Sequence, residues 1–168
     1  GEGVINDEDR TVIGNSIPRF TFGLNLGFEY KGFDFSCFFQ GVGKADGYVT
    51  MEAIQPMGIN GARKEHYKES FNPQDPKPGA YFPRILSSDY NYAYMSHWVQ
   101  DASYIRLKNL QIGYSFKIKG LNQLRVYASG ENLFTATKYR TWDPETPVGA
   151  RGFYPNVAVY SMGVNLNF

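Results

Sequence analysis

Residues 160–168 read YSMGVNLNF, and apolar residues alternate with small or polar ones along the whole stretch. Successive side chains of a β-strand point to opposite faces. One face of this predicted strand therefore carries Tyr160, Met162, Val164, Leu166 and Phe168. The other face carries Ser161, Gly163, Asn165 and Asn167. A strand of this kind is typical of a transmembrane β-barrel, where the apolar face meets lipid, and these five apolar residues are the predicted membrane-facing residues.

Residues 19–30 repeat this pattern over a longer stretch, with an apolar residue at every even position from Phe20 to Tyr30. Strands of soluble proteins usually have about 5 to 6 residues, whereas a tilted strand needs about 9 to 11 to cross a bilayer. Lys31 and Gly32 predict a tight turn, and residues 33–42 predict a second strand. We interpret the single cysteine, Cys37, as a small hydrophobic residue on the apolar face of that strand.

Three more strands are predicted, and they cover residues 98–116, 123–131 and 160–168. Within residues 98–116 the apolar phase changes at Lys108 and Asn109. This change predicts either a β-bulge or an upper half of the strand whose apolar residues face packed protein. The connections between the five strands alternate in length, being short at residues 31–32 and 117–122 and long at residues 43–97 and 132–156.

The alternation of short and long connections favours an up-and-down barrel, because such barrels have short periplasmic turns and long extracellular loops. The predicted fold class is all-β: about five antiparallel, up-and-down strands within residues 19–168 that form part of a large transmembrane β-barrel. Residues 1–18, 43–97 and 132–156 are predicted to be extracellular. Five strands cannot close around a polar interior, so their edges are expected to pair with strands encoded elsewhere.

Composition excludes several other classes. The net charge is +1 without a basic stripe, which gives no support for nucleic-acid binding. No apolar run approaches the ~18 residues of a transmembrane helix. The loop carboxylates, Asp143 and Glu145 among them, have no partner base or nucleophile in the sequence pattern, so no enzyme activity is predicted. The chain begins with Gly1 and has no signal peptide, and we therefore expect a piece of a longer protein.

Aromatic residues concentrate at the mouth end of the predicted strands. Aromatic rings stack on ligands and anchor protein interfaces, so these residues are candidates for substrate or partner contact. The alternative is an aromatic girdle at the membrane interface. The candidate residues are Tyr90, Tyr92, Tyr94, Trp98, Tyr139 and Trp142.

The N-terminal residues match the second half of a calcium-binding loop, in which oxygen ligands recur around a glycine turn. The matching residues are Glu2, Gly3, Ile5, Asn6 and Asp9. Because the first two ligand positions would precede Gly1, an ordinary polar turn is favoured over a calcium site. We predict no metal and no other cofactor.

Four stretches resemble the C-terminal end of the SusC/RagA family of TonB-dependent outer-membrane transporters of Bacteroidetes. They are GEGVINDEDRTVIGN at residues 1–15, YKGFD at residues 30–34, ASYIRLKNLQIGY at residues 102–114 and ENLFTATKY at residues 131–139. The resemblance covers the whole chain. It implies the last five strands of a plugged barrel of the ~22-stranded class.

The resemblance also implies a function and partners. The family imports oligosaccharides or peptides across the bacterial outer membrane, working with a SusD-like surface lipoprotein and powered through TonB. Expected partners are the upstream part of the same barrel, the SusD-like lipoprotein, the lipid bilayer, and TonB through an upstream region. Two alternatives stay open: a soluble β-sandwich that binds carbohydrate, and a small self-contained outer-membrane barrel. The sequence does not name the imported molecule.

Overall fold

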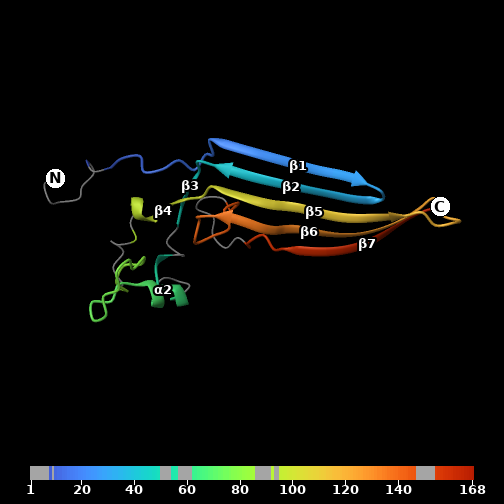
Figure 1. Cartoon of the computed structure of the whole chain (residues 1–168). Coiled ribbons are helices and arrows are strands. Elements are labelled where there is room, and N and C mark those ends of the chain that lie inside the picture. Colours follow the sequence, from blue (N-terminus) through green and yellow to red (C-terminus); the bar gives the residue numbers. More distant parts are fainter. Residues whose placement is uncertain are drawn as a thin grey trace.

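A computed structural model describes residues 8, 10–49, 54–56, 62–85, 92, 95–146 and 154–168. Five long strands form one antiparallel sheet with the order β1-β2-β5-β6-β7 (Figure 1). Their bounds are Phe20–Tyr30 for β1, Phe33–Gly43 for β2, Tyr104–Phe116 for β5, Gln123–Thr137 for β6 and Val159–Asn167 for β7. Every strand pairs with its sequence neighbour in this sheet, which confirms the predicted up-and-down arrangement of five strands.

The register places most of the apolar side chains of the five strands on one face; Phe38 of β2, opposite Asn25 of β1, is an exception on the other face. Leu26 of β1 lies opposite Cys37 of β2, which lies opposite Leu110 of β5. Val126 of β6 lies opposite Val164 of β7 in the same way. We call this the apolar face and the opposite one the polar face. No Asp, Glu, Lys or Arg of the five described strands lies on the apolar face.

The apolar face is open to its surroundings. Phe22, Leu26, Val164 and Leu166 are 48%, 49%, 59% and 54% exposed. A soluble sandwich would bury these four residues under a second sheet. The second sheet in the described residues has two short strands, β3 (Asp46–Tyr48) and β4 (Val99–Asp101), and it forms beyond the end of the long strands. The open face is therefore contrary to the sandwich alternative.

The change of apolar phase in β5 is a β-bulge. The pairing with β2 shifts between Phe38 and Phe39, and the pairing with β6 shifts between Leu107 and Asn109. Lys108 is the extra residue, and Leu107 returns to the same face as Leu110. The bulge, one of two predicted possibilities, is thus confirmed, and it keeps the apolar face continuous.

Strand β6 is longer than predicted. The sequence suggested an end at Glu131, but β6 continues to Thr137. Asn132 has a φ of 51°, in the left-handed region, and the β5–β6 register steps from Glu131 to Phe134 around it. The turn-like Asn132 therefore makes a bulge rather than a strand end, and the loop to β7 covers residues 138–158 instead of 132–156.

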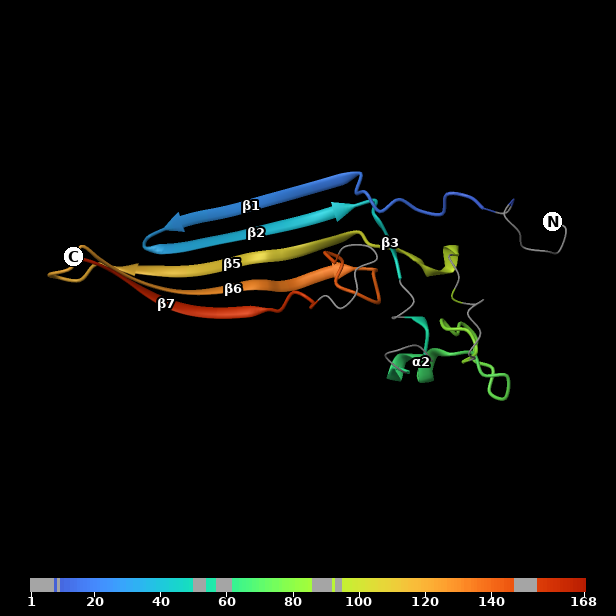
Figure 2. The same ribbon diagram turned by 180° about the vertical axis from the view of Figure 1, so that it is seen from behind.

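Both predicted short turns lie at the end of the sheet where the chain terminates, and both long connections lie at the other end (Figure 2). Lys31 and Gly32 have φ values of 48° and 88°, as a two-residue hairpin turn of type I′ requires. The two short connections thus lie together at one end of the sheet and the two long ones at the other, as predicted for an up-and-down arrangement.

The long connection between β2 and β5 is not structureless. It contains β3, the helix α2 (Lys64–Glu69), the 3₁₀-helix η3 (Ser96–Trp98) and β4. The predicted strand over residues 98–116 is accordingly divided, because Val99–Asp101 pairs with β3 and only Tyr104–Phe116 joins the long sheet. None of the helices in the described ranges has the length and apolarity that a membrane crossing demands.

We use the name cap for the folded unit formed by these connections. It comprises the described parts of two connections, residues 44–49, 54–56, 62–85, 92, 95–103 and 138–146. Figures 1 and 2 both show it at the end of the sheet opposite the short turns.

Candidate functional site

The polar face of the sheet carries an ion pair that spans three strands. The Arg125 guanidinium of β6 donates from Nε to Asp34 Oδ2 of β2 over 3.0 Å, and its Nη2 also contacts Asp34. Gly113 of β5 lies between them, and a Cβ at this position would come within 2.3 Å of Asp34 Oδ2. The glycine leaves room for Arg125 and Asp34 to meet across the central strand. The pair thereby joins β2 to β6, which are separated by β5 in the sheet.

The cap has a hydrophobic core of its own. Trp98 is 0% exposed and Val49 is 0% exposed, and Ile54 and Ala102 complete the aliphatic part of the cluster. Tyr92 stacks near Trp98 with ring centroids 6.3 Å apart. This core joins residues from both long connections, because Tyr139 of the second connection belongs to it.

The structure places the six predicted contact aromatics in different settings. Tyr92, Trp98 and Tyr139 are buried in the cap core, where their rings pack on protein. Burial raises the pKa of Tyr92 and of Tyr139, so both phenols stay neutral well above neutral pH. Trp142 keeps an intermediate exposure beside the core. Tyr90 and Tyr94 lie outside the described residues.

Side-chain contacts tie the two connections to each other at the surface of the cap. Arg140 Nη2 pairs with Glu69 Oε2 of α2 at 2.8 Å, and the Arg140 guanidinium lies over the Tyr81 ring at 4.8 Å. Arg63 lies over the Trp142 ring at 5.3 Å. Burial raises the pKa of Tyr81, although its hydrogen bond with Gln100 acts in the opposite direction.

A charged cluster is buried where the cap meets the polar face of the sheet. Arg106 of β5 is only 2% exposed. Its Nη2 donates to both carboxylate oxygens of Asp143, at 2.9 and 2.8 Å, and its Nε donates to Thr135 Oγ1 at 2.7 Å. Glu145 Oε2 lies 3.0 Å from Arg106 Nη1 and 2.8 Å from Lys108 Nζ. Two cations and two carboxylates thus balance one another.

Asp143 is the centre of this cluster. Burial acts to raise its pKa, but the hydrogen bond from the Glu145 amide and the Arg106 guanidinium outweigh that effect and lower the pKa below its usual value. Sequence reasoning treated Asp143 and Glu145 as loop carboxylates without partners. Two cations, Arg106 and Lys108, near the loop end of a predicted strand could have indicated a site for carboxylates. The sequence does not show which carboxylates pair with them.

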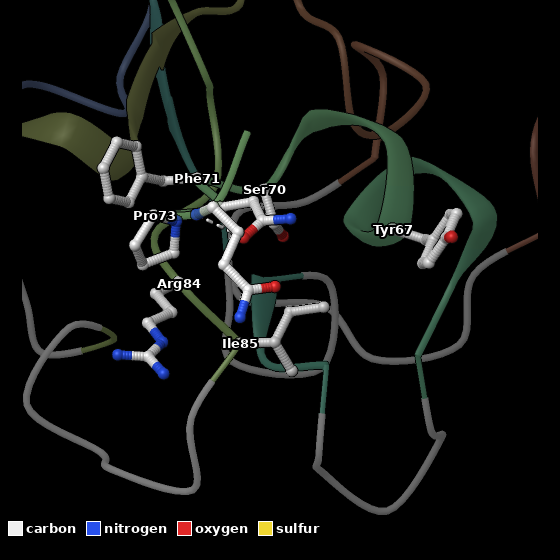
Figure 3. Close-up of a pocket in the computed structure, with 8 residues that line it drawn as sticks. Tyr67, Ser70, Phe71, Pro73, Arg84 and Ile85 are labelled. Carbon is white, nitrogen blue, oxygen red and sulfur yellow. Dashed lines mark hydrogen bonds between the residues drawn. The ribbon is translucent and has the colours of Figure 1, made fainter. Parts of the chain in front are cut away.

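Two neighbouring cavities open on the surface of the cap. The first has a volume of about 360 Å³, and the second, of about 490 Å³, shares Phe71 with it. Figure 3 shows Phe71, Pro73, Arg84 and Ile85 on one side of the first cavity, whereas Tyr67 extends from α2 on the other side. The walls are fixed to each other, because the Phe71 amide donates to the Phe82 carbonyl at 2.9 Å.

Within the described ranges, no group of three His, Cys, Asp or Glu side chains is placed to hold a metal ion. The residues of the half calcium motif, Glu2, Gly3, Ile5, Asn6 and Asp9, lie outside the described residues. The structure therefore leaves that motif as a sequence pattern.

Comparison with known proteins identifies the class. The chain is 35% identical over its whole length to TonB-dependent receptor P3 of Formosa agariphila, of which it covers 18%. It is 27% identical over its whole length to TonB-dependent receptor SusC of Bacteroides thetaiotaomicron, of which it covers 17%. No protein-family model matches the chain.

The fold agrees with a solved structure from the same class. The structure of the RagAB peptide importer in the open-open state matches 92% of this chain and 18% of its own chain, with a TM-score of 0.71 and 25% sequence identity. The closed-closed state of the same importer gives a TM-score of 0.68. The five-stranded sheet therefore corresponds to part of the RagA barrel.

The chain is homologous over its full length to part of the TonB-dependent receptors, a class of outer-membrane transport proteins rather than enzymes. Within that class its relatives are of the SusC/RagA type, as the sequence motifs predicted. The chain spans between 17% and 19% of the length of the curated relatives that it matches.

Proposed function

We propose that this chain supplies the last five strands of the barrel of an outer-membrane importer of the SusC/RagA type. In this proposal the apolar face touches lipid and the polar face lines the lumen. Residues 1–18, the cap and the loop between β6 and β7 lie outside the cell. The remaining strands of the barrel come from the rest of the receptor and pair with the free edges of β1 and β7.

The observation that carries this proposal is the open apolar face. Its side chains run the length of five strands without a charged residue, and Phe20, Leu24, Phe28 and Met162 are between 49% and 91% exposed. Monomeric soluble proteins rarely leave so large a contiguous apolar patch uncovered. Lipid covers such a face without cost, and the polar face then meets water in the lumen.

The cargo and the partners of the whole importer belong to the same proposal. RagAB is a peptide importer, and the sequence resemblance to the family adds oligosaccharides as the second class of cargo. We propose that the receptor works with a SusD-like surface lipoprotein and with TonB. Of the predicted aromatic contacts, we propose Trp142 for substrate or lipoprotein, because its ring remains half-buried, and Tyr90 and Tyr94 stay predictions. Tyr92, Trp98 and Tyr139 pack inside the cap, which supports a structural role for them.

The orientation of the two faces is tested with neighbouring residues at the middle of β1. Leu26→Arg places a charge on the apolar face, and Asn25→Arg places the same charge on the polar face. An arginine that faces lipid near the midplane costs about 2 to 4 kcal/mol, whereas lumenal substitutions are tolerated. We expect the Leu26→Arg receptor to be depleted from the outer membrane and the Asn25→Arg receptor to keep wild-type abundance.

The measurement is the amount of heat-modifiable, folded full-length receptor in outer-membrane fractions. Equal abundance of the two variants, or loss of Asn25→Arg alone, contradicts the assignment of faces. Import itself is measured as uptake of labelled peptides and of labelled oligosaccharides by cells with and without TonB. Uptake that does not depend on the receptor and on TonB contradicts the proposed transport function.

A further inference from the structure

The charged cluster under the cap has no counterpart elsewhere in the described part of the sheet. Arg106 lies on the polar face, where a strand side chain would ordinarily be wet, yet its side chain is only 3% exposed. A buried guanidinium is strongly destabilising unless its charge and its donors are matched. Asp143, whose side chain is 9% exposed, and Glu145, at 18%, supply the matching charge from the loop between β6 and β7, although Arg106 Nη1 and Glu145 Oε1 make no hydrogen bond with the described residues.

The same carboxylates hold both ends of that loop. Asp143 accepts hydrogen bonds from the backbone amide of Glu145 at 3.0 Å and from that of Asn156 at 3.2 Å. The Asn156 side chain in turn donates from Nδ2 to Glu145 Oε2 at 2.6 Å. Arg106 therefore orients one carboxylate that binds the outgoing and the returning segment of the loop together.

Strand β6 adds a further contact to the returning segment. Asn132, the residue of the bulge, donates from Nδ2 to the Val157 carbonyl at 3.3 Å, and its Oδ1 faces Lys108 Nζ at 3.5 Å. The two bulge residues, Lys108 of β5 and Asn132 of β6, thus both face the loop. Bulges commonly redirect side chains to a particular site, and here the site is the base of the loop.

The ion pair of Arg125 and Asp34 serves as an internal comparison. It also lies on the polar face, with side chains 21% and 24% exposed, but both partners belong to strands. It ties β2 to β6 and has no contact with the loop among the described residues. The Arg106 cluster differs because it joins strand and loop, and because it is more deeply buried.

We propose that Arg106 is a positioning residue that fixes the two described segments of the connection between β6 and β7, residues 138–146 and 154–158, to the lumenal wall, so that these segments are a fixed part of the passage and not a gate. The inference rests on the proposed function, since only a transporter has a passage to be lined. Where these segments meet the wall, the charges of Arg106 and Lys108 are balanced by those of Asp143 and Glu145. The movements that admit cargo then occur elsewhere in the receptor.

The first test measures backbone hydrogen exchange in the full-length receptor, isolated with its partner. In Arg106→Ala we expect the amides of Glu145 and Asn156 to exchange about ten-fold faster or more, because both donate to Asp143. Arg125→Ala, which removes an arginine from the same face, is the matched control and should leave these amides unchanged. Arg106→Lys keeps the charge but loses the two-pronged contact, and it should give an intermediate rate.

Unchanged exchange in Arg106→Ala, or an equal rise in Arg125→Ala, overturns the positioning role. If Arg106→Ala does not assemble in the membrane, Asp143→Asn removes the negative charge while it keeps the size of the side chain. Protected Glu145 and Asn156 amides in Asp143→Asn then overturn the proposal in the same way.

The second test asks whether the loop moves during transport. Lys108 Nζ and Asn156 Nδ2 both contact Glu145 Oε2, so cysteines at positions 108 and 156 lie within reach of a short bis-maleimide. The receptor carries Cys37→Ala and no other accessible cysteine, and the two single-cysteine receptors are the controls. We expect cross-linking to leave uptake of labelled peptide or oligosaccharide unchanged.

Loss of uptake on cross-linking, with normal uptake in the treated single-cysteine receptors, identifies the loop as a gate and overturns the proposal. Failure of the proposed function looks different. In that case the receptor without cross-links does not take up cargo in a TonB-dependent way, while the exchange rates still report whether Arg106 holds the loop.

Discussion

The five-stranded sheet and the cap use the same aromatic and aliphatic residues in opposite ways. In the sheet, Phe22 and Leu166 stand on an open face and are about half exposed, at 48% and 54%. In the cap, Trp98 and Val49 are fully enclosed, at 0%. The cap buries its apolar residues, as proteins in water do, whereas the sheet exposes them. The two regions are therefore built for different solvents, as expected of a wall in lipid and a loop domain in water.

The two regions also differ in what holds them together. The sheet is a ladder of backbone pairs between sequence neighbours, from Phe20 opposite Gly43 to Gln123 opposite Asn167. The cap is joined by side chains, such as Arg140 with Glu69, which lie 71 positions apart. Damage to one region should therefore leave the other largely intact.

The largest effect is expected from Trp98→Ala in the cap core. Replacing a buried tryptophan with alanine typically costs about 3 to 5 kcal/mol, and Trp98 contacts rings on several sides. We expect the cap to become sensitive to protease while the folded barrel remains in the membrane. Limited proteolysis of whole cells, followed by a heat-modifiability assay, measures both properties. The control is Tyr67→Ala, because Tyr67 is 83% exposed.

If Trp98→Ala prevents barrel assembly altogether, the cap and the sheet are one cooperative unit and not two independently stable regions. If Tyr67→Ala is as damaging as Trp98→Ala, the contact surface of α2 matters more than the core.

The next effect concerns pH and the Asp143 cluster. The pKa of Asp143 is lower in the folded protein than the value of about 3.9 for an unfolded chain. Its contribution to stability is therefore fully present above about pH 4 and is lost as the pH falls through the lower folded pKa. We expect protection of the Glu145 amide to decline only in that acidic range. Hydrogen exchange at a series of pH values, corrected for the intrinsic rate, measures the decline.

In Asp143→Asn the pH dependence that belongs to this carboxyl should disappear, and protection should be low throughout. A decline that begins near neutral pH in the wild type would contradict the lowered pKa.

A smaller effect is expected from Gly113→Ala on the polar face of the sheet. The new Cβ would collide with Asp34 and would approach Arg125 Nη2 to 2.8 Å, so the ion pair must leave its place above β5. Because the pair is partly exposed, we expect a loss of about 0.5 to 1 kcal/mol, seen as a lower midpoint of thermal unfolding of the barrel. Gly27→Ala is the matched control, since its Cβ would meet its first neighbour, the Phe35 carbonyl, at an ordinary 3.4 Å. A lower midpoint in Gly27→Ala of the same size would mean that the ion pair is not the cause.

The smallest effect is expected from Arg140→Ala at the surface of the cap. The ion pair with Glu69 is 55% and 38% exposed, and such pairs contribute about 0 to 1 kcal/mol. The contact with the Tyr81 ring adds a comparable amount. The protease sensitivity of the cap should rise slightly, far less than in Trp98→Ala. The control is Lys77→Ala, which removes an exposed cation that pairs only loosely, with Asp75 at 3.7 Å. A change as large as that of Trp98→Ala would show that the surface contacts, and not the core, hold the two connections together.

The sequence predicted the sheet well because the signal is local. Alternation of period two in Phe20 to Tyr30 and in Tyr160 to Leu166 marks both the strand and its faces, whatever surrounds them. The bulge at Lys108 was also visible as a change of phase. The end of β6 was predicted wrongly, because Asn132 has the character of a turn residue, and only its pairing partner shows that the strand continues.

The site could be predicted only in part. The sequence pointed to the aromatic residues of the loops, but it did not show that Tyr92, Trp98 and Tyr139 pack against one another inside the cap. It gave no indication that Arg106 would meet Asp143, 37 positions later in the chain. Contacts of this kind depend on how two long connections fold over each other, and no periodicity encodes that.

Sequence alone thus determined the strands, their two faces and the relation to SusC/RagA-type receptors, because side-chain alternation and short motifs are properties of neighbouring residues. Only the tertiary structure decided that the loops form a cap with a core, and that a buried arginine joins the loop to the wall. The physical reason is that burial and charge pairing are set by residues far apart in the chain, which come together when the strands fix the distance and direction between them.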